Sequence, residues 1–292
     1  MAFAATNEGC RVTPATDEQE VKRAVRQLLA RAGIHAAPVD LGRVARAQRA
    51  TIEDANLGTL DGCLVPTREG FVIKINVCMP EPRRRFSLAH EIGHTLLRNA
   101  GGACKYRHLI TRAKVRAGSA RQREERLCDI AAAEILMPER LFRPWLAGRA
   151  TSVRAIEAAA THFEVSRQAA AIRLSEASEA PAEIVCWKPR GSVLEAAWLT
   201  GSRYFSQYAS QDEMSRAFTD LESAPVRALW SSRIEIANDE PVRADGRGPK
   251  FYCESKAFGA AEHRYVLSVI KKRLTPKQFA GLTTVMAHRL GG

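Results

Sequence analysis

The segment Arg85-Phe-Ser-Leu-Ala-His-Glu-Ile-Gly-His94 contains the pattern H-E-x-x-H. In a helix, residues four apart lie on one face about one turn apart, so the imidazoles of His90 and His94 can both reach one zinc ion. Glu91 lies between them in sequence and can act as general base toward the attacking water. The predicted helix, over 83–98, is apolar on more than one face and should be central. Two histidines and a carboxylate buried there without partners would cost on the order of several kcal/mol, which favours a metal site.

A second predicted helix, over 122–137, offers carboxylates for the third protein ligand that a catalytic zinc site needs. Glu125 and Asp129 lie four residues apart on one helical face. Glu125 can therefore bind the metal while Asp129 holds a histidine N–H. Glu124 points about 100° away around the helix and is the alternative ligand. An ion pair between Glu125 and a neighbouring arginine is the competing interpretation.

The motif Arg85–His94, followed by Ala132-Ala-Glu-Ile-Leu-Met-Pro138, resembles the ImmA/IrrE family of zinc metallopeptidases. Its members typically show R-F-(S/T)-x-A-H-E-x-G-H and then E-x-x-A-N-x-x-A-A-x-L-L-M-P. The resemblance covers about residues 18–177. The chain departs from the pattern at Cys128 and Asp129, where Ala-Asn is commoner. An aspartate keeps the acceptor that an asparagine would offer, so the substitution should leave the site intact.

The resemblance implies an α+β fold, with a zincin-like peptidase domain built on a small antiparallel sheet. It also implies one Zn2+ per chain, held by His90, His94 and Glu125. Glu91 would deprotonate the attacking water and pass the proton to the leaving amine, while the zinc polarises the scissile carbonyl.

An extra hydrogen-bond donor usually stabilises the oxyanion of such reactions. Tyr106 and His108 lie in the predicted loop between the two helices and are candidates, although either can be an ordinary loop residue. Residues 63–65 and 71–76 flank a turn-rich segment and predict an antiparallel hairpin. The second of these strands could pair with an extended substrate at a sheet edge, or it could be an interior strand.

The sequence predicts four segments, with a loose tail over 1–17 and the peptidase-like domain over 18–150. A helix-turn-helix-like extension over 151–180 and a C-terminal mixed α/β domain over 181–292 follow. Some members of the resembled family carry a GAF-like sensory domain, and the C-terminal pattern is compatible with a regulatory domain of that kind. Further strands are expected at 184–187, 194–200, 234–236 and 265–270, with a loop at 238–250 and a terminal helix over 275–288.

The helical pair has the spacing of a DNA-binding helix-turn-helix, with Ser166 predicted to cap its second helix. Arg167, Gln168 and Arg173 on that helix are residue types that contact phosphates and base edges. The alanines at 169–171 leave much of the helix without such groups. A packed helical hairpin is therefore favoured, and nucleic acid binding stays an unfavoured alternative.

The 292 residues include 44 basic and 32 acidic side chains, a formal net charge of +12, and the isoelectric point is about 9.7. Such a charge favours an anionic partner, but an arginine-rich surface with no binding role explains it equally well. Seven scattered cysteines without C-x-x-C predict reduced thiols, hence a cytoplasmic protein. No secretory signal is recognisable, and no segment approaches the roughly 18 apolar residues of a membrane span.

Together these observations predict a cytoplasmic zinc endopeptidase. The resemblance implies that its substrate is a helix-turn-helix transcriptional repressor, cleaved to derepress stress or mobile-element genes. The alternative is a DNA-binding transcriptional regulator with a structural or vestigial metal site. Glu91 discriminates between them, because peptide hydrolysis needs a general base and a structural site does not.

Overall fold

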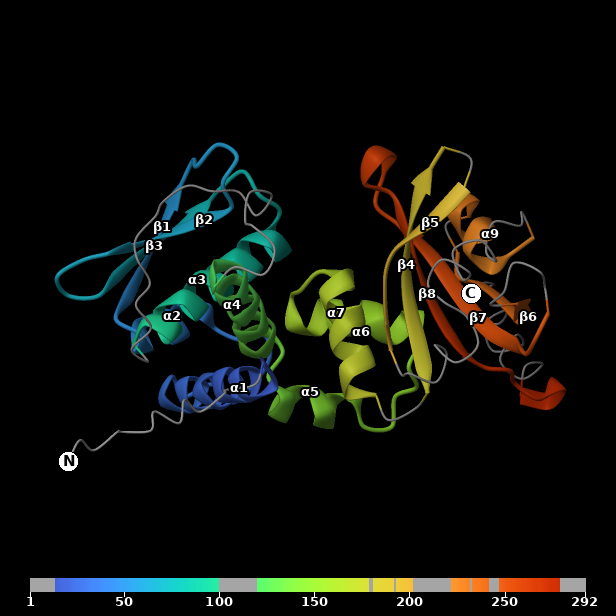
Figure 1. Cartoon of the computed structure of the whole chain (residues 1–292), viewed down its shortest axis with the longest axis horizontal. Helices are drawn as coiled ribbons and strands as arrows, with labels where there is room; N and C mark the ends of the chain where they lie inside the picture. The colour runs from blue at the N-terminus through green and yellow to red at the C-terminus, as the bar shows by residue number, and fades with distance from the viewer. Residues whose placement is uncertain are drawn as a thin grey trace, which may run out of the picture. The chain divides into compact units, whose positions relative to one another are not determined.

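The computed structural model describes residues 14–99, 120–178, 181–191, 193–201, 222–231, 233–241 and 247–278. Its contacts divide the chain into two compact units. The N-terminal unit comprises Met1–Phe142 with His162–Val165, and the C-terminal unit comprises Arg143–Thr161 with Ser166–Gly292. Each unit combines helices with one β-sheet (Figure 1), which agrees with the predicted α+β class.

The N-terminal unit places a small sheet beside a group of helices. In chain order its elements are α1 (Pro14–Arg31), α2 (Leu41–Ala47), β1 (Ala50–Ala55), β2 (Gly62–Pro66), β3 (Phe71–Asn76), α3 (Glu81–Asn99), α4 (Ala120–Leu136) and the first half of α5 (Glu139–Leu146). Helices α3 and α4 and the β2–β3 hairpin match the sequence-based expectation.

The sheet is mixed, so the expectation of a purely antiparallel sheet is wrong. Its strand order is β1-β3-β2, with β3 antiparallel to β2 and parallel to β1. Most side chains of β1 are exposed, so this strand lacks the alternation of apolar and polar residues that predicts a half-buried strand. β3 is the interior strand, which leaves β2 pairing only with β3 among the described residues.

Helices α3 and α4 pack closely against each other. Ala89 and Ile92 of α3 are fully buried, as is Ala131 of α4. A Cβ built at Gly93 would lie 3.2 Å from the Cβ of Ala131 and 3.3 Å from the Cα of Cys128. The glycine therefore permits an approach that a larger side chain would hinder, and it brings the carboxylates of α4 against the H-E-x-x-H segment.

The C-terminal unit is built on a five-stranded sheet of order β5-β4-β8-β7-β6, in which all neighbouring strands are antiparallel. One strand, β7, was not expected, and β6 extends into the segment expected to be a loop. The elements of this unit are α6 (Val153–Phe163), α7 (Arg167–Ala177), β4 (Ala182–Arg190), β5 (Val193–Gly201), α9 (Ala224–Trp230), β6 (Glu235–Pro241), β7 (Lys250–Phe258), η2 (Ala261–His263) and β8 (Tyr265–Lys272).

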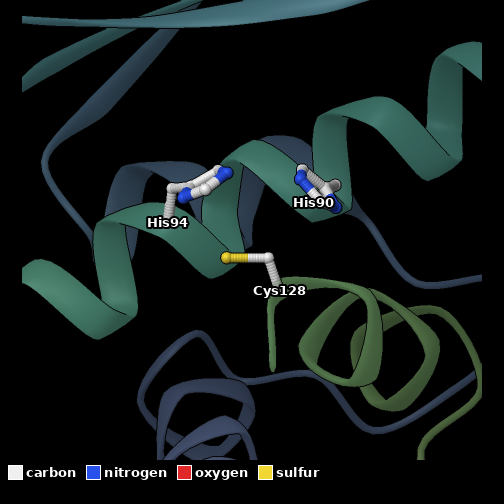
Figure 2. Close-up of side chains that lie close together, drawn as sticks. All are labelled: His90, His94 and Cys128. Carbon is white, nitrogen blue, oxygen red and sulfur yellow. The ribbon is translucent and has the colours of Figure 1, made fainter. Parts of the chain in front are cut away.

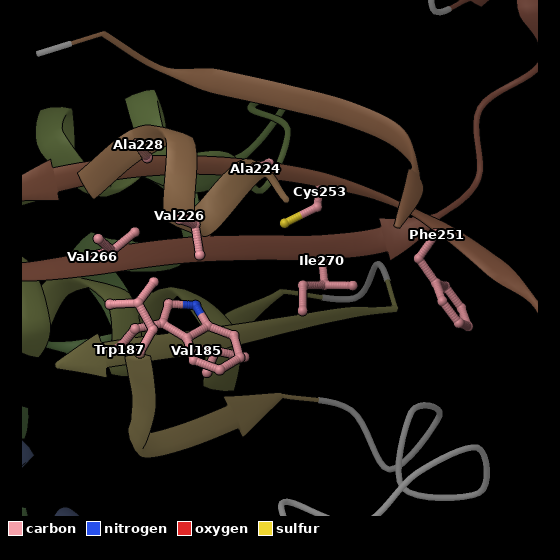
Figure 3. Packing of buried hydrophobic residues seen from close by; sticks show 10 residues of the cluster. Val185, Trp187, Ala224, Val226, Ala228, Phe251, Cys253, Val266 and Ile270 are labelled. Carbon is pink, nitrogen blue, oxygen red and sulfur yellow. The ribbon is translucent and has the colours of Figure 1, made fainter. Parts of the chain in front are cut away.

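Helix α9 covers one face of this sheet. Val226 of the helix packs with Trp187, Val266 and Ile270 of the strands in a buried apolar cluster (Figure 3). The side chains of Tyr252, Glu254 and their alternating neighbours point to the opposite face. The sheet thus has a core of its own, which suits an independently folded unit.

Helix α7 packs on β4 and β5 of the C-terminal sheet, and an ion pair joins α6 to the same sheet. Glu157 of α6 forms an ion pair of 2.8 Å with Lys256 of β7. Ser175 of α7 lies 2.9 Å from the hydroxyl of Thr200 on β5. Ser166 caps α7 as predicted, its hydroxyl accepting a hydrogen bond from the backbone N–H of Ala169 at 3.1 Å.

Two expected features lie partly or wholly outside the described residues. The tail over 1–17 is described only from residue 14, where α1 already begins. The terminal helix expected over 275–288 is described only to residue 278, and its opening turn is closed by Thr275 and Gln278.

Candidate metal centre

Helix α3 presents two imidazoles toward one carboxylate of α4. The Nε2 atom of His90 lies 3.3 Å from Oε2 of Glu125, and the Nε2 atom of His94 lies 4.0 Å from Oε1 of the same group. Nitrogen and oxygen ligands of one tetrahedral zinc ion lie about 3.3 Å apart. The two distances end on different oxygens of Glu125, so the three side chains must move before they can share one zinc ion.

Asp129 holds the other ring nitrogen of His90, with 2.9 Å between Nδ1 and Oδ1. Burial alone would lower the pKa of His90, but the hydrogen bonds to Asp129 and Glu125 outweigh it and raise the pKa to about 9. In the metal-free protein a proton can thus occupy the nitrogen that faces Glu125. Metal binding would release that proton, while Asp129 keeps the ring in one orientation.

Glu124, the alternative third ligand, lies on the opposite side of the second histidine. Its Oε1 atom is 3.3 Å from Nδ1 of His94, whereas Glu125 faces Nε2 of that ring. This placement suits Glu124 to orient His94 in the way that Asp129 orients His90. Among the carboxylates of the described residues whose contacts with both rings are known, Glu125 faces the Nε2 atoms of both histidines.

The competing interpretation of Glu125 as an ion-pair partner receives limited support. Arg121 approaches it at 4.0 Å, and Arg126 instead pairs with Glu18 of α1 at 2.6 Å. The hydrogen bond from His90 lowers the pKa of Glu125 despite the opposing effect of burial. The carboxylate is therefore ionised and available as a metal ligand.

Glu91 points toward strand β2 and is half-buried. A Cβ built at Gly62 would lie 3.6 Å from Cγ of Glu91. Burial raises the pKa of Glu91, although the neighbouring histidines oppose the shift. Burial and the charge of Glu91 also raise the pKa of Cys63, the next residue on β2. A carboxylate whose pKa moves toward neutrality is better matched to proton transfer in the physiological range.

Cys128 is a further member of this site that sequence reasoning did not propose as a ligand. Its Sγ atom and one ring nitrogen from each of His90 and His94 all lie within 4.8 Å of one another (Figure 2). The sequence carried a signal, because Cys128 follows Glu125 by three residues and so shares its helical face.

The remaining predicted site residues lie elsewhere. Tyr106 and His108 fall outside the described residues. Arg167 places its guanidinium 4.9 Å over the ring of Phe258. Arg173 is buried and lies 3.4 Å from Glu176, and Gln168 is half-buried. These last three belong to the C-terminal unit, apart from the histidine cluster.

The chain was compared with known protein families, curated proteins and solved structures. The family model described as "IrrE N-terminal-like domain" matches residues 49–175. The "Radiation response metalloprotease IrrE" of Deinococcus radiodurans is 29% identical over 199 residues, covering 66% of this chain and 59% of the relative. The protein of the same name from Deinococcus deserti is 30% identical over 202 residues, covering 67% and 70%. The match therefore spans about three fifths of the first relative.

A solved structure described as a "Mycobacterium tuberculosis transcriptional regulator" has a related fold. Its TM-score is 0.58 at 12% sequence identity, and the match covers 87% of this chain and 76% of that one. Identity this low indicates fold alone. None of the described helices combines the length and the apolar character that crossing a membrane requires.

Proposed function

Because this chain belongs to the ImmA/IrrE family of metallopeptidases, we propose that it is a zinc-dependent endopeptidase with its catalytic centre between α3 and α4. His90, His94 and Glu125 are the proposed ligands of one Zn2+, and Glu91 is the proposed general base. The observation that carries the proposal is the convergence of two imidazoles and one carboxylate. A catalytic site needs three such protein ligands and one open position.

The side chains of the site have different proposed roles in peptide hydrolysis. When bound, a zinc ion supplies the Lewis acidity that polarises the scissile carbonyl. Glu91 accepts a proton from the attacking water on its carboxylate and then gives it to the leaving amine. Asp129 and Glu124 each hold one histidine through Nδ1, so the rings need not reorient during turnover.

Strand β2 is the proposed place for the substrate backbone. It is an outer strand among the described residues, and it passes beside Glu91 at Gly62. An extended peptide can add to such an edge through main-chain hydrogen bonds. Glycine at this position keeps side-chain bulk away from the general base.

The proposed substrate is a helix-turn-helix transcriptional repressor, and the proposed location is the cytoplasm. The relatives named for a radiation response support a stress-linked role. The C-terminal unit, with its separate core, is the proposed regulatory part, and its GAF-like character stays a prediction. The segments 1–17, 18–150, 151–180 and 181–292 remain the proposed functional divisions.

The test replaces Glu91 with Gln, which keeps the size of the side chain but removes the base. Wild-type protein and Glu91→Gln, both loaded with zinc, are incubated with purified candidate repressors, and new N-termini are identified by mass spectrometry. We expect the cleavage rate to fall about 1000-fold while bound zinc stays stoichiometric. Glu81→Gln, at an exposed position of the same helix, is the matched control and should cleave like wild type. Equal cleavage by zinc-loaded Glu91→Gln would contradict the mechanism.

The alternative function, a DNA-binding regulator, finds less support in the helical pair. Arg173 is buried, and Arg167 is stacked on Phe258. If the alternative holds, Glu91→Gln should leave every activity of the protein unchanged, and DNA binding should be lost on replacing Gln168 and Arg167.

A further inference from the structure

A thiol lies against the predicted metal ligands. Cys128 follows Glu125 by three residues on α4, and its side chain is fully buried. Figure 2 shows its sulfur directed toward α3, where His90 and His94 extend from the same helical face. Its Sγ atom and a nitrogen of each ring form a cluster in which no pair is more than 4.8 Å apart.

The close packing of α3 and α4 determines where the backbone of Cys128 lies. A Cβ built at Gly93 would lie 3.3 Å from both the Cα and the carbonyl oxygen of Cys128. The backbone of α4 therefore presses against α3 at a residue that has no side chain. From this backbone position the Sγ atom of Cys128 lies within 4.8 Å of one ring nitrogen of each histidine of the motif.

The cluster has nearly the dimensions that a zinc ion requires. A nitrogen and a sulfur bound to one tetrahedral zinc lie about 3.6 Å apart, given Zn–N and Zn–S bonds of about 2.1 and 2.3 Å. Movements of about 1 Å in the side chains would close the remaining gap, which rotamer adjustments can supply. Thiolate is also among the ligands that zinc prefers.

The donor set therefore extends beyond the three expected ligands. We propose that Cys128 binds the same ion as His90, His94 and Glu125 in the resting site, and that it must leave the ion before the attacking water can bind, because a catalytic site needs one open position. The thiol proton leaves to solvent as the Zn–S bond forms, because a coordinating cation deprotonates a thiol. This inference rests on the proposed function, since it adds a donor to the same site.

A coordinating cation binds the thiolate directly and deprotonates the thiol. Sulfur ligation also favours zinc over oxygen-seeking ions such as Mg2+ and Mn2+.

X-ray absorption at the zinc edge of the full-length, zinc-loaded protein tests the inference directly. We expect one sulfur scatterer at about 2.3 Å in wild type and nitrogen or oxygen scatterers only in Cys128→Ala. Zinc affinity, measured by competition with a chromophoric chelator, should fall at least about tenfold in Cys128→Ala. Cys186→Ala, which removes a buried thiol of the C-terminal unit, is the matched control and should retain the sulfur scatterer.

Any other result of these measurements contradicts either the role of Cys128 or the proposed function. Bound zinc with only nitrogen and oxygen scatterers in wild type overturns the role of Cys128 and leaves the proposed peptidase site standing. A sulfur scatterer that persists in Cys128→Ala assigns the bond to another cysteine and also overturns the inference. No zinc in wild type after reconstitution overturns both this inference and the proposed function.

Discussion

Both units bury charged side chains, but they arrange them in opposite ways. In the N-terminal unit, His90, Asp129 and Glu125 converge with His94 on one small volume between two helices. In the described part of the C-terminal unit, the buried Glu254 and the half-buried Lys271 instead bind backbone groups near the start of α6 and the hydroxyl of Tyr252. Burial of a charge is common to both regions, and only convergence of several donors distinguishes the candidate metal centre.

The C-terminal unit shows the structural use of buried charge. Glu254 accepts hydrogen bonds from the hydroxyl of Tyr252 at 2.8 Å and from the backbone N–H of Val153 at the start of α6. Lys271 donates to the carbonyl of Thr151 at 2.7 Å. Burial lowers the pKa of Lys271, and the charge of Glu254 opposes the shift. These groups attach the start of α6 to the sheet.

The largest expected effect is on metal binding in the N-terminal unit. Glu125→Ala removes one of the proposed ligands, each of which should supply about 3 kcal/mol of zinc binding, so affinity should fall about 100-fold. Zinc content after dialysis, measured by mass spectrometry, checks this. Unfolding of the C-terminal unit should be unchanged. Zinc retained at wild-type affinity would assign the ligand role to Glu124, which Glu124→Ala would then reveal.

A substitution in the C-terminal unit should lower stability without affecting metal binding. Glu254→Ala removes the carboxylate that caps α6 and leaves the hydroxyl of Tyr252 and the charge of Lys271 without it, so the free energy of unfolding should fall by about 2 kcal/mol. Urea unfolding followed by tryptophan fluorescence measures the loss, and zinc content should not change. Glu262→Ala, at an exposed position of η2, is the control and should unfold like wild type. A loss of zinc in Glu254→Ala would mean that the two regions are not independent.

A smaller effect is expected where a carboxylate acts on the metal through a histidine. Asp129→Ala removes the partner of Nδ1 in His90, so zinc affinity should fall about 10-fold. Asp129→Asn keeps an acceptor oxygen and should lose less. Competition with a chelator ranks the three proteins. If Asn and Ala variants lose affinity equally, the charge of Asp129 matters more than its hydrogen bond.

The smallest effect concerns pH and the buried Glu183 of β4. Burial raises its pKa to about 7 from the ordinary value of 4.5. The folded protein thus keeps this proton at pH values where the unfolded chain has lost it, so stability should fall as pH rises from about 4.5 to 7 and then level off. Glu183→Gln should raise the free energy of unfolding at pH 8 by about 1 kcal/mol, after allowance for solvent screening, and have little effect at pH 4. An equal effect at both pH values would exclude titration as its cause.

Periodicity predicted the long helices and the β2–β3 hairpin because those segments carry clear apolar patterns. It did not predict β1, whose side chains are mostly exposed and which is held by backbone pairing with β3. It also missed β7, where Glu254 and Ser255 interrupt the apolar residues although both are buried. Their partners, Val153 and Ser268, are far away in sequence and cannot be found by local analysis.

The sequence alone specified the pair His90 and His94 and the proposed general base between them, because spacing within one helix places side chains on a face whatever surrounds it. The tertiary structure was needed to show that Glu125 faces both Nε2 atoms while Glu124 faces Nδ1 of His94. It was also needed to show that the sulfur of Cys128 lies close to both histidine rings. These relations depend on how two helices cross at Gly93, and packing between helices is not encoded in the periodicity of either one.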